Sequence, residues 1–455
     1  MDFWTKVAFF LLMGFSVSGR AFAYLGIPPA KLFIGDLALA AFMLFKPRAI
    51  FDRWHEGLTR GGPLGSISWI FLLSILYGVF EVISGLLSGY PPLVAFENLV
   101  FNIYPLYLFL GIWAGQHRPD LLRKWIIWYA WFLTFYGPLY IAFLDKITWT
   151  VPGSDAVIFQ QAGGGSVVLL GILCFEKKPL KYWLPLTLGA FMLLATEVRA
   201  EWVGFILAMM IWGFFGKKMH RVVLAMSLIG AFLVVGALAD ISLPGMKSRG
   251  GDVSTRDILG RAISSFNPEL AEEYSPNAAV YAGTVTWRTT WWKAIRESVV
   301  VDVPTFLFGH GYGYPLKDLV PYTKNMDLRT PHSIFYFCLG YGGAVGVVIF
   351  FSLQAALAWL LWSTYKLTGQ VFGLAFWASS LLSAFFGNSF ETPFGAIPFY
   401  LIMGVAIAPV IRKHLNAKEA RSLARAIAHS VPGYTPVNGP TRSVSGEKLY
   451  ARISS

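Results

Sequence analysis

The short polar segment 196–201 (TEVRAE) contains the first candidate functional side chains of the chain. It interrupts two apolar runs and places Arg199 between Glu197 and Glu201, in a turn too short to be a domain. An arginine in such a turn can bind an anion. It can equally snorkel from the end of a membrane helix and pair with a glutamate. Arg199 is therefore a candidate anion-binding residue, with Glu197 and Glu201 as supporting residues.

A second arginine, Arg288, lies in the tryptophan-rich segment 284–292 (TVTWRTTWW). Arginine among tryptophans is typical of a headgroup anchor at a membrane surface, so that role is the alternative to ligand binding. Apolar residues recur along this segment and beyond it at near-helical spacing: Trp287, Trp291, Ile295 and Val299. This spacing predicts an amphipathic helix, and its Trp and Arg content favours a helix that lies at the interface.

The third group begins with segment 309–313 (GHGYG), which carries three alternating glycines, Gly309, Gly311 and Gly313. Glycines allow the backbone to approach a ligand closely, but this spacing without a following helix is a weak phosphate signal. After a polar stretch, His332 and Ser333 stand at the entry of an apolar segment. A lone histidine there is often structural, yet its usual pKa suits general acid–base catalysis near neutral pH.

Metal and disulfide chemistry find little support. The two cysteines, Cys174 and Cys338, lie inside apolar runs, which excludes a disulfide framework and a cysteine-based zinc site. No DxD-type acidic pair occurs, and the acidic cluster at 269–273 is more typical of a solvated helical face. We expect no metal and no cofactor.

The elements that must position these residues are membrane helices. Of the 455 residues, 56% are hydrophobic and 14% charged, whereas an average soluble domain has roughly 25% charged residues. A spanning helix needs about 20 mostly apolar residues. Twelve segments are candidates: 7–24, 31–45, 66–84, 93–115, 122–144, 156–174, 182–196, 202–215, 222–239, 333–362, 371–386 and 393–411.

The basic residues support this count independently, because short cytoplasmic loops collect Lys and Arg. With the N-terminus inside, 23 of the 37 Lys and Arg fall in cytoplasmic segments, four in or beside short outer connections, and ten in one long loop. This pattern explains the net charge of +12 without nucleic acid. It also argues against cleavage of the first span as a signal peptide, since cleavage would invert the pattern.

The sequence thus predicts an all-α polytopic membrane protein with about twelve spans and both termini inside. Residues 1–239 hold nine spans, and 240–331 form an outer loop domain with ten acidic and ten basic residues. Residues 332–412 hold the last three spans. A basic cytoplasmic tail follows at 413–455; it is suited to contact anionic membrane lipids and is expected to be disordered beyond residue 429. A loop as long as 240–331 is usually functional.

Together these residues resemble the bacterial O-antigen ligase and polymerase superfamily. Segment 196–199 is similar to its Thr-x-Ser-Arg turn, and Arg288 followed by 308–313 is similar to its Arg…Trp…Gly-x-Gly segment. His332 and Ser333, nine residues and then 343–346 (GAVG) resemble the ligase pattern of His, a small polar residue, nine of any kind and Gly-x-x-Gly. The likeness covers roughly 196–346.

Two positions depart from the superfamily's pattern. Val198 stands where the superfamily usually has Ser, and Ala200 where it often has Gly, so no role for that hydroxyl is carried over. The ligase pattern also occurs loosely among the polymerases and the protein-targeting oligosaccharyltransferases of the superfamily.

The resemblance implies a glycosyltransferase C-like fold in the bacterial inner membrane with a large periplasmic loop. It implies glycan transfer from undecaprenyl diphosphate to an acceptor hydroxyl on the periplasmic side, with lipid A-core as the foremost acceptor. Arg199 and Arg288 would hold the donor diphosphate, which the planar guanidinium suits. His332 would be the general base on the acceptor hydroxyl, or its orienting partner. A single displacement would invert the anomeric configuration.

Two other functions stay open from the sequence. A polymerase that lengthens a lipid-linked glycan uses the same donor chemistry, and its acceptor preference depends on cavity shape. A flippase or another transporter would also have about twelve spans. Transporters place ionisable groups near the bilayer midplane and often contain repeats. Asp36, Glu81 and Glu97 are such groups, but no repeat and no basic stripe accompanies them.

Overall fold

The chain folds into helices joined by short connections. The computed structural model describes residues 1–27, 32–160, 164–195, 198–239, 241–243, 253–264, 267–275, 278–324 and 330–430. The chain divides into two units, residues 1–411 and 412–455. In the second unit the described residues are helical up to residue 430, and most of the tail predicted to be disordered lies outside the described residues.

The first half of the chain is helical apart from one two-stranded antiparallel ribbon, β1 (Gly26–Ile27) with β2 (Leu32–Phe33). Its α-helices are α1 (Phe3–Ala23), α2 (Ile34–Phe45), α3 (Pro47–Arg60), α4 (Gly65–Leu87), α5 (Pro92–Ile103), α6 (Tyr107–His117), α7 (Leu121–Ala142), α8 (Gly165–Phe175), α9 (Trp183–Ala195), α10 (Arg199–Phe215) and α11 (Met219–Leu238). Short 3-10 helices are η2 (Tyr104–Leu106), η3 (Leu144–Lys146) and η4 (Pro179–Tyr182).

Residues 240–331, which are predicted to be the outer loop and keep that name below, are also mostly helical in their described part. A second antiparallel ribbon, β3 (Ser242–Leu243) with β4 (Val253–Ser254), opens it. The helices that follow are α12 (Thr255–Ile263), α13 (Pro268–Tyr274), α14 (Ala278–Val299), α15 (Val303–Phe308), η6 (Leu316–Leu319), α16 (Pro321–Lys324), α17 (Ile334–Thr368), α18 (Phe372–Phe385) and α19 (Pro393–Ser430). The two ribbons are small additions to the predicted all-α class.

Each of the twelve predicted spans contains a helix. Six helical segments of the described residues are long and apolar enough to cross a membrane: Phe3–Ala23, Gly65–Leu87, Pro92–His117, Met219–Leu238, Ile334–Thr368 and Pro393–Leu423. Four further apolar segments are shorter: Ile34–Phe45, Gly165–Phe175, Pro179–Ala195 and Phe372–Phe385. The protein is therefore a helical, multi-pass membrane protein, while the count of twelve spans stays a prediction.

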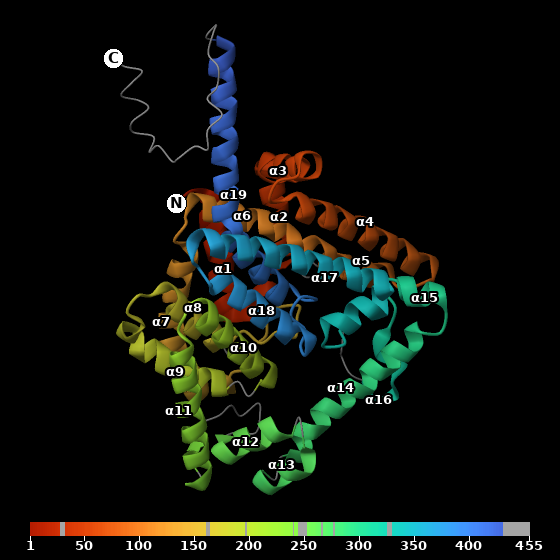
Figure 1. The fold of residues 1–455 in the computed structure, drawn as a ribbon. Coiled ribbons are helices and arrows are strands. Elements are labelled where there is room, and N and C mark those ends of the chain that lie inside the picture. Colours follow the sequence, from red (N-terminus) through yellow and green to blue (C-terminus); the bar gives the residue numbers. More distant parts are fainter. Residues whose placement is uncertain are drawn as a thin grey trace. The chain divides into compact units, whose positions relative to one another are not determined.

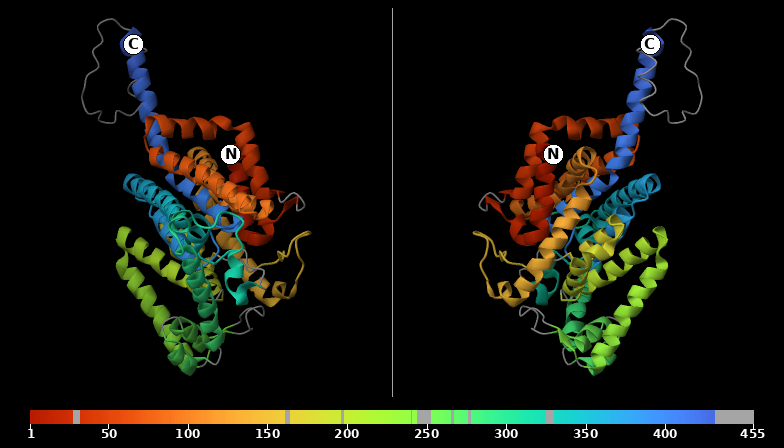
Figure 2. Two further views of the ribbon diagram at one scale, coloured as in Figure 1. Left: turned by 90° about the vertical axis from the view of Figure 1, so that its right-hand side faces the viewer. Right: turned by 90° about the vertical axis from the view of Figure 1, so that its left-hand side faces the viewer.

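Two helices of the outer loop, α12 and α13, lie at one end of the first unit beside the end of α11, whereas α15 packs against α17 (Figure 1). Helix α14 leads from α13 to α17. The amphipathic helix α3 lies at the opposite end (Figure 2). Small residues let the membrane helices approach closely: a Cβ added to Gly404 of α19 would lie 2.8 Å from the Cα of Gly111 of α6.

Segment 309–313 fastens the outer loop to the membrane helices. The backbone N–H groups of His310 and Gly311 donate to carbonyl oxygens of α17, and that of Tyr312 donates to Glu81 O of α4 at 3.1 Å. Helix α17 is kinked at Gly343, whose φ is +55°. A Cβ at Gly343 would lie 2.6 Å from Gly309 N, so the loop and the kink fit together only with glycine.

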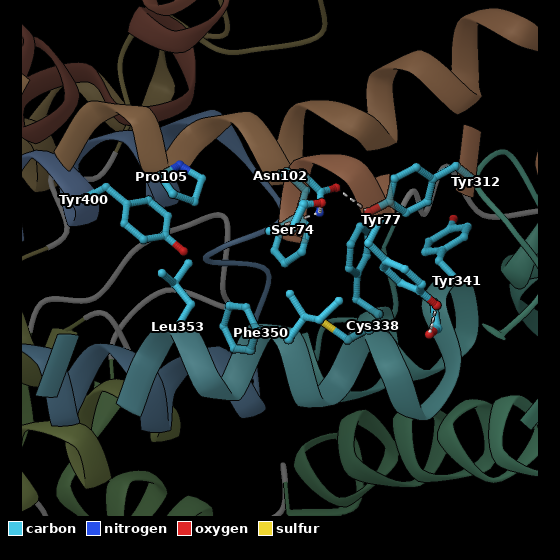
Figure 3. A pocket seen from close by; sticks show the side chains of 15 residues that line it. Ser74, Tyr77, Asn102, Pro105, Tyr312, Cys338, Tyr341, Phe350, Leu353 and Tyr400 are labelled. Carbon is cyan, nitrogen blue, oxygen red and sulfur yellow. Dashed lines mark hydrogen bonds between the residues drawn. The ribbon is translucent and has the colours of Figure 1, made fainter. Parts of the chain in front are cut away.

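Buried polar contacts continue this junction inward, beside a small cavity of about 20 Å³ between α4, α5 and α17 (Figure 3). The Tyr312 hydroxyl donates to Asn102 Oδ1 at 2.6 Å, and Asn102 donates in turn to Ser74 O at 2.9 Å. The Tyr77 hydroxyl donates to Gly342 O at 2.6 Å. These bonds tie segment 309–313 to α5 and α4, and they tie α17 to α4 directly before the kink. They therefore help to fix the helix that begins beside His332.

Candidate active site

His332 directly precedes the N-cap of α17 and has a backbone conformation that is rare for its type. Its φ is +53°, and it is one of two non-glycine residues with positive φ in the described part of the chain. The left-handed region costs an L-residue roughly 1–2 kcal/mol. Residues held this way against local preference cluster at functional sites. Ser333, the N-cap residue, is buried beside it.

Trp287 of α14 connects His332 to Arg288. The rings of Trp287 and His332 meet edge to face, with centroids 5.8 Å apart and an interplanar angle of 90°. The guanidinium carbon of Arg288 lies 5.3 Å from the Trp287 ring centroid, within cation–π range. One indole therefore contacts both the histidine and the arginine that were separate candidates in the sequence.

Arg288 is half-buried, and its guanidinium is only partly satisfied. Nη1 donates to Phe386 O at 3.0 Å, in the turn between α18 and α19. Nε is buried without a hydrogen-bond partner in the part of the chain that the structure describes. A buried, charged donor without a partner is costly unless a ligand satisfies it.

Arg199, the first residue of α10, faces the outer loop. Its Nη1 donates to Ser264 Oγ at 3.0 Å, at the end of α12. The start of α10 is also held from α18, because Ser383 Oγ donates to Ala200 O at 3.3 Å. Glu201 lies on the same turn of α10, whereas Glu197 lies outside the described residues.

The charges of these residues interact along a line. Burial lowers the pKa of His332, and the charge of Arg288 lowers it further, to about 4. Burial also lowers the pKa of Arg288, and the charge of Arg199 adds to this effect. Arginine stays protonated in spite of such shifts. The site thus combines permanent cations with an imidazole that is neutral at physiological pH, as a general base must be.

The position of α14 differs from the sequence-based interpretation. The predicted periodicity is confirmed, because Trp291, Ile295 and Val299 are buried on one face. That face packs within the protein rather than along a membrane surface: Trp291 Nε1 donates to Leu316 O at 2.8 Å. On the adjoining face, Trp292 Nε1 donates to Pro331 O at 2.7 Å. These indoles position Arg288 and the backbone next to His332.

The glycine-rich segment is not part of this cluster. Gly309, Gly311 and Gly313 all have positive φ, but their close approach is to α17, α4 and α5 rather than to an open cleft. His310 is held elsewhere, with Nε2 3.0 Å from Ser298 Oγ and its ring stacked on Tyr314. Packing and hydrogen bonding therefore explain the three glycines and His310 without a ligand.

A cleft of about 290 Å³ opens beside the cluster, between α8, α10, α18 and α19. Glu201 lines it together with Ser383 and Ser389, which flank Phe386, the residue whose carbonyl Arg288 contacts. Its other walls include apolar residues such as Leu170 and Phe399. A site with cations next to a cleft of mixed polarity can accommodate an amphiphilic anion.

Sequence reasoning missed three neighbours of these arginines: Ser264, the Phe386 carbonyl and Arg261, whose charge acts on Arg199. Arg261 was one of ten basic residues in a long loop, and nothing in its local sequence set it apart. The contact of Phe386 with Arg288 joins residues 98 positions apart, which local patterns do not report. No group of three His, Cys, Asp or Glu side chains that could hold a metal ion occurs among the described residues.

The protein is a helical, multi-pass membrane protein whose arginine–histidine cluster is formed by the start of α10, by α14 and by the residue before the N-cap of α17. Residues 184–351 match the family model described as O-antigen ligase. The predicted resemblance to the O-antigen ligase superfamily is thereby confirmed, over a range that includes Arg199, Arg288 and His332. No match is found among curated proteins. This match supports a role in glycan transfer in O-antigen and polysaccharide biosynthesis.

Proposed function

We propose that this protein is an inverting, metal-independent glycosyltransferase of the O-antigen ligase type. It transfers a glycan from undecaprenyl diphosphate to an acceptor hydroxyl, foremost on lipid A-core, at the periplasmic face of the bacterial inner membrane. The observation that supports this most directly is the pairing of Arg288 with His332 across Trp287. It sets a partly unsatisfied guanidinium next to a neutral imidazole.

The proposed reaction is a single displacement at the anomeric carbon. The acceptor oxygen forms the new bond to that carbon, and the bond to the diphosphate oxygen breaks with its electron pair leaving on the diphosphate. Arg199 and Arg288 stabilise the charge that develops on this leaving group. His332 takes the proton of the acceptor hydroxyl, so atoms and charge balance without a metal. Inversion follows because attack and departure occur on opposite faces.

The test is transfer from a lipid-diphosphate glycan to lipid A-core by the purified protein in the presence of EDTA, with the product length measured. We expect one glycan to be added per acceptor. Growth of the lipid-linked glycan instead would assign the protein as a polymerase. Strict dependence on added Mg²⁺ or Mn²⁺ would remove the basis for the roles of Arg199 and Arg288. Transport of the lipid-linked glycan without transfer would favour a flippase.

The periplasmic location of the site has its own test. A cysteine placed at Glu273 of α13 should be labelled only from the outer side, and one at Lys177, between α8 and α9, only from the cytoplasm. Labelling of position 273 from the cytoplasm would overturn both the topology and the location of the site.

A further inference from the structure

The end of α12 docks onto Arg199 through a buried serine. Ser264 has 3% of its surface exposed and accepts a hydrogen bond from Arg199 Nη1 at 3.0 Å. Its hydroxyl donates to Arg261 O at 2.9 Å. Residues three apart on a helix lie on the same face, so the Arg261 side chain leaves α12 next to the contact between Ser264 and Arg199.

Helix α12 is itself held in place. Ser254 and Asp257 form a capping box at its start, with Ser254 Oγ accepting from Asp257 N at 2.9 Å. The Asp257 carboxylate also accepts a hydrogen bond from Ser275, just after α13. A Cβ added to Gly260 would lie 2.8 Å from Ser275 Cβ, so α12 and the end of α13 are in close contact. The residue after Gly260 is Arg261, whose backbone position is therefore fixed.

Starting from His332, the three arginines follow one another in the order Arg288, Arg199 and Arg261. His332 is affected by the charge of Arg288, Arg288 by that of Arg199, and Arg199 by that of Arg261. Arg288 adjoins the proposed base, and Arg261 stands at the far end of the line. Direct contacts give the same order. Trp287 contacts both His332 and Arg288. Arg288 donates to Phe386 O just after α18, and Ser383 of α18 donates to Ala200 O, next to Arg199. Arg199 in turn donates to Ser264, whose hydroxyl donates to Arg261 O.

A donor diphosphate has one phosphate bonded to the sugar and one bonded to the lipid. The row of arginines can bind these two phosphates at different positions. The phosphate bonded to the sugar must lie near the acceptor hydroxyl and hence near His332. The phosphate bonded to the lipid then lies further along the line. We propose, on the basis of the function proposed above, that Arg261 is a third donor-binding residue that holds the lipid-side phosphate with Arg199, while Arg288 holds the sugar-side phosphate.

The test uses two lipid probes and the purified full-length protein in lipid nanodiscs. Undecaprenyl monophosphate carries only the lipid-side phosphate, whereas undecaprenyl diphosphate carries both. Arg261→Ala should weaken the binding of both probes by a similar factor, about 10- to 100-fold for the loss of a charge-assisted contact. Arg288→Ala should weaken the binding of undecaprenyl diphosphate by a similar factor and leave the binding of undecaprenyl monophosphate nearly unchanged.

The matched control is Arg256→Ala, which removes the same charge from the exposed part of the same helix. It should leave the Kd of both probes unchanged, and it also measures any nonspecific effect of net charge. Arg261→Lys keeps the charge but not the planar fork, so it should fall between Arg261→Ala and the wild type. Melting temperatures within experimental error of the wild type show that binding losses are not unfolding.

The outcomes separate this inference from the function on which it rests. If the wild type binds the diphosphate and only Arg288→Ala weakens this binding, the proposed function is retained and Arg261 is not a donor-binding residue. If Arg261→Ala weakens the diphosphate alone, the order of the two phosphates is reversed. If the wild type binds neither probe, the proposed donor is wrong.

Discussion

Two histidines lie in the long loop before α17, and we propose a catalytic role for only one of them. His310 and His332 are both half-buried. His310 stacks on Tyr314 with ring centroids 4.1 Å apart, and its Nε2 lies 3.0 Å from Ser298 Oγ. His332 instead meets the edge of Trp287 and has a left-handed backbone.

Their electrostatic surroundings differ more sharply than their burial. Burial lowers the pKa of both histidines. At His310 the carboxylate of Asp302 opposes this effect, whereas at His332 the charge of Arg288 strengthens it. A neighbouring cation keeps an imidazole neutral and also attracts an anionic substrate to it. The sign of the nearest charge, more than burial, thus separates a candidate base from a structural histidine.

Replacing each histidine by alanine gives the largest expected difference between His332 and His310. His332→Ala should lower the rate of transfer by about 10²- to 10⁴-fold, the usual cost of losing a general base, with donor binding nearly unchanged. His310→Ala should leave turnover per folded molecule close to wild type. The measurements are single-turnover rates and donor Kd for both variants. Comparable losses of turnover in the two would show that the distinction is wrong.

Arg288→Lys tests the cation beside His332, because it keeps the positive charge and removes the planar guanidinium. We expect donor affinity and turnover to fall by about 10-fold or more, because a point charge cannot form paired hydrogen bonds with a phosphate. Steady-state kinetics at varied donor concentration measures both parameters. The control is Arg296→Ala, on an exposed part of the same helix, which should behave as wild type. Full activity of Arg288→Lys would show that position 288 needs only a positive charge and not a guanidinium.

The pH dependence tests the influence of Arg288 on His332. The free enzyme should lose activity as the pH falls through about 4, because the imidazole becomes protonated there. An anionic donor favours the protonated form, so the acidic limb of kcat should lie at higher pH than that of kcat/KM. Arg288→Ala should move the limb of kcat/KM upward as well, since a positive neighbour is lost. Identical limbs in the wild type and Arg288→Ala would show that the two groups do not interact.

The smallest expected effect on the chemistry comes from the junction that holds His310. Gly343→Ala places a side chain in a left-handed position and against Gly309 N. We expect a loss of about 1–3 kcal/mol in the free energy of unfolding, with near-normal turnover per folded molecule. Gly230→Ala in α11 is the control, because a Cβ there meets nothing within 4 Å. Thermal unfolding in detergent measures both variants. Equal stabilities would remove the structural account of the kink.

The sequence predicted the helices well because lipid imposes apolar runs that hydropathy reveals. It predicted the buried face of α14 through Trp291 and Ile295, since helical spacing is a local property. It could not predict what covers that face, because Leu316 reaches it from η6, 25 residues further along the chain. The same limit applies to the candidate site. Arg288 and His332 stood out by type, but Trp287 as their shared neighbour depends on how α14 meets α17.

The left-handed backbone of His332 has an evolutionary consequence. Glycine is the residue that this conformation would accommodate most easily, so a random search for greater stability would tend to replace the histidine. If His332 is the base, such a replacement would gain a more robust protein and lose the enzyme. Consensus or stability-guided redesign of this chain should therefore exclude position 332 from its allowed substitutions, since robustness and catalysis select different side chains there.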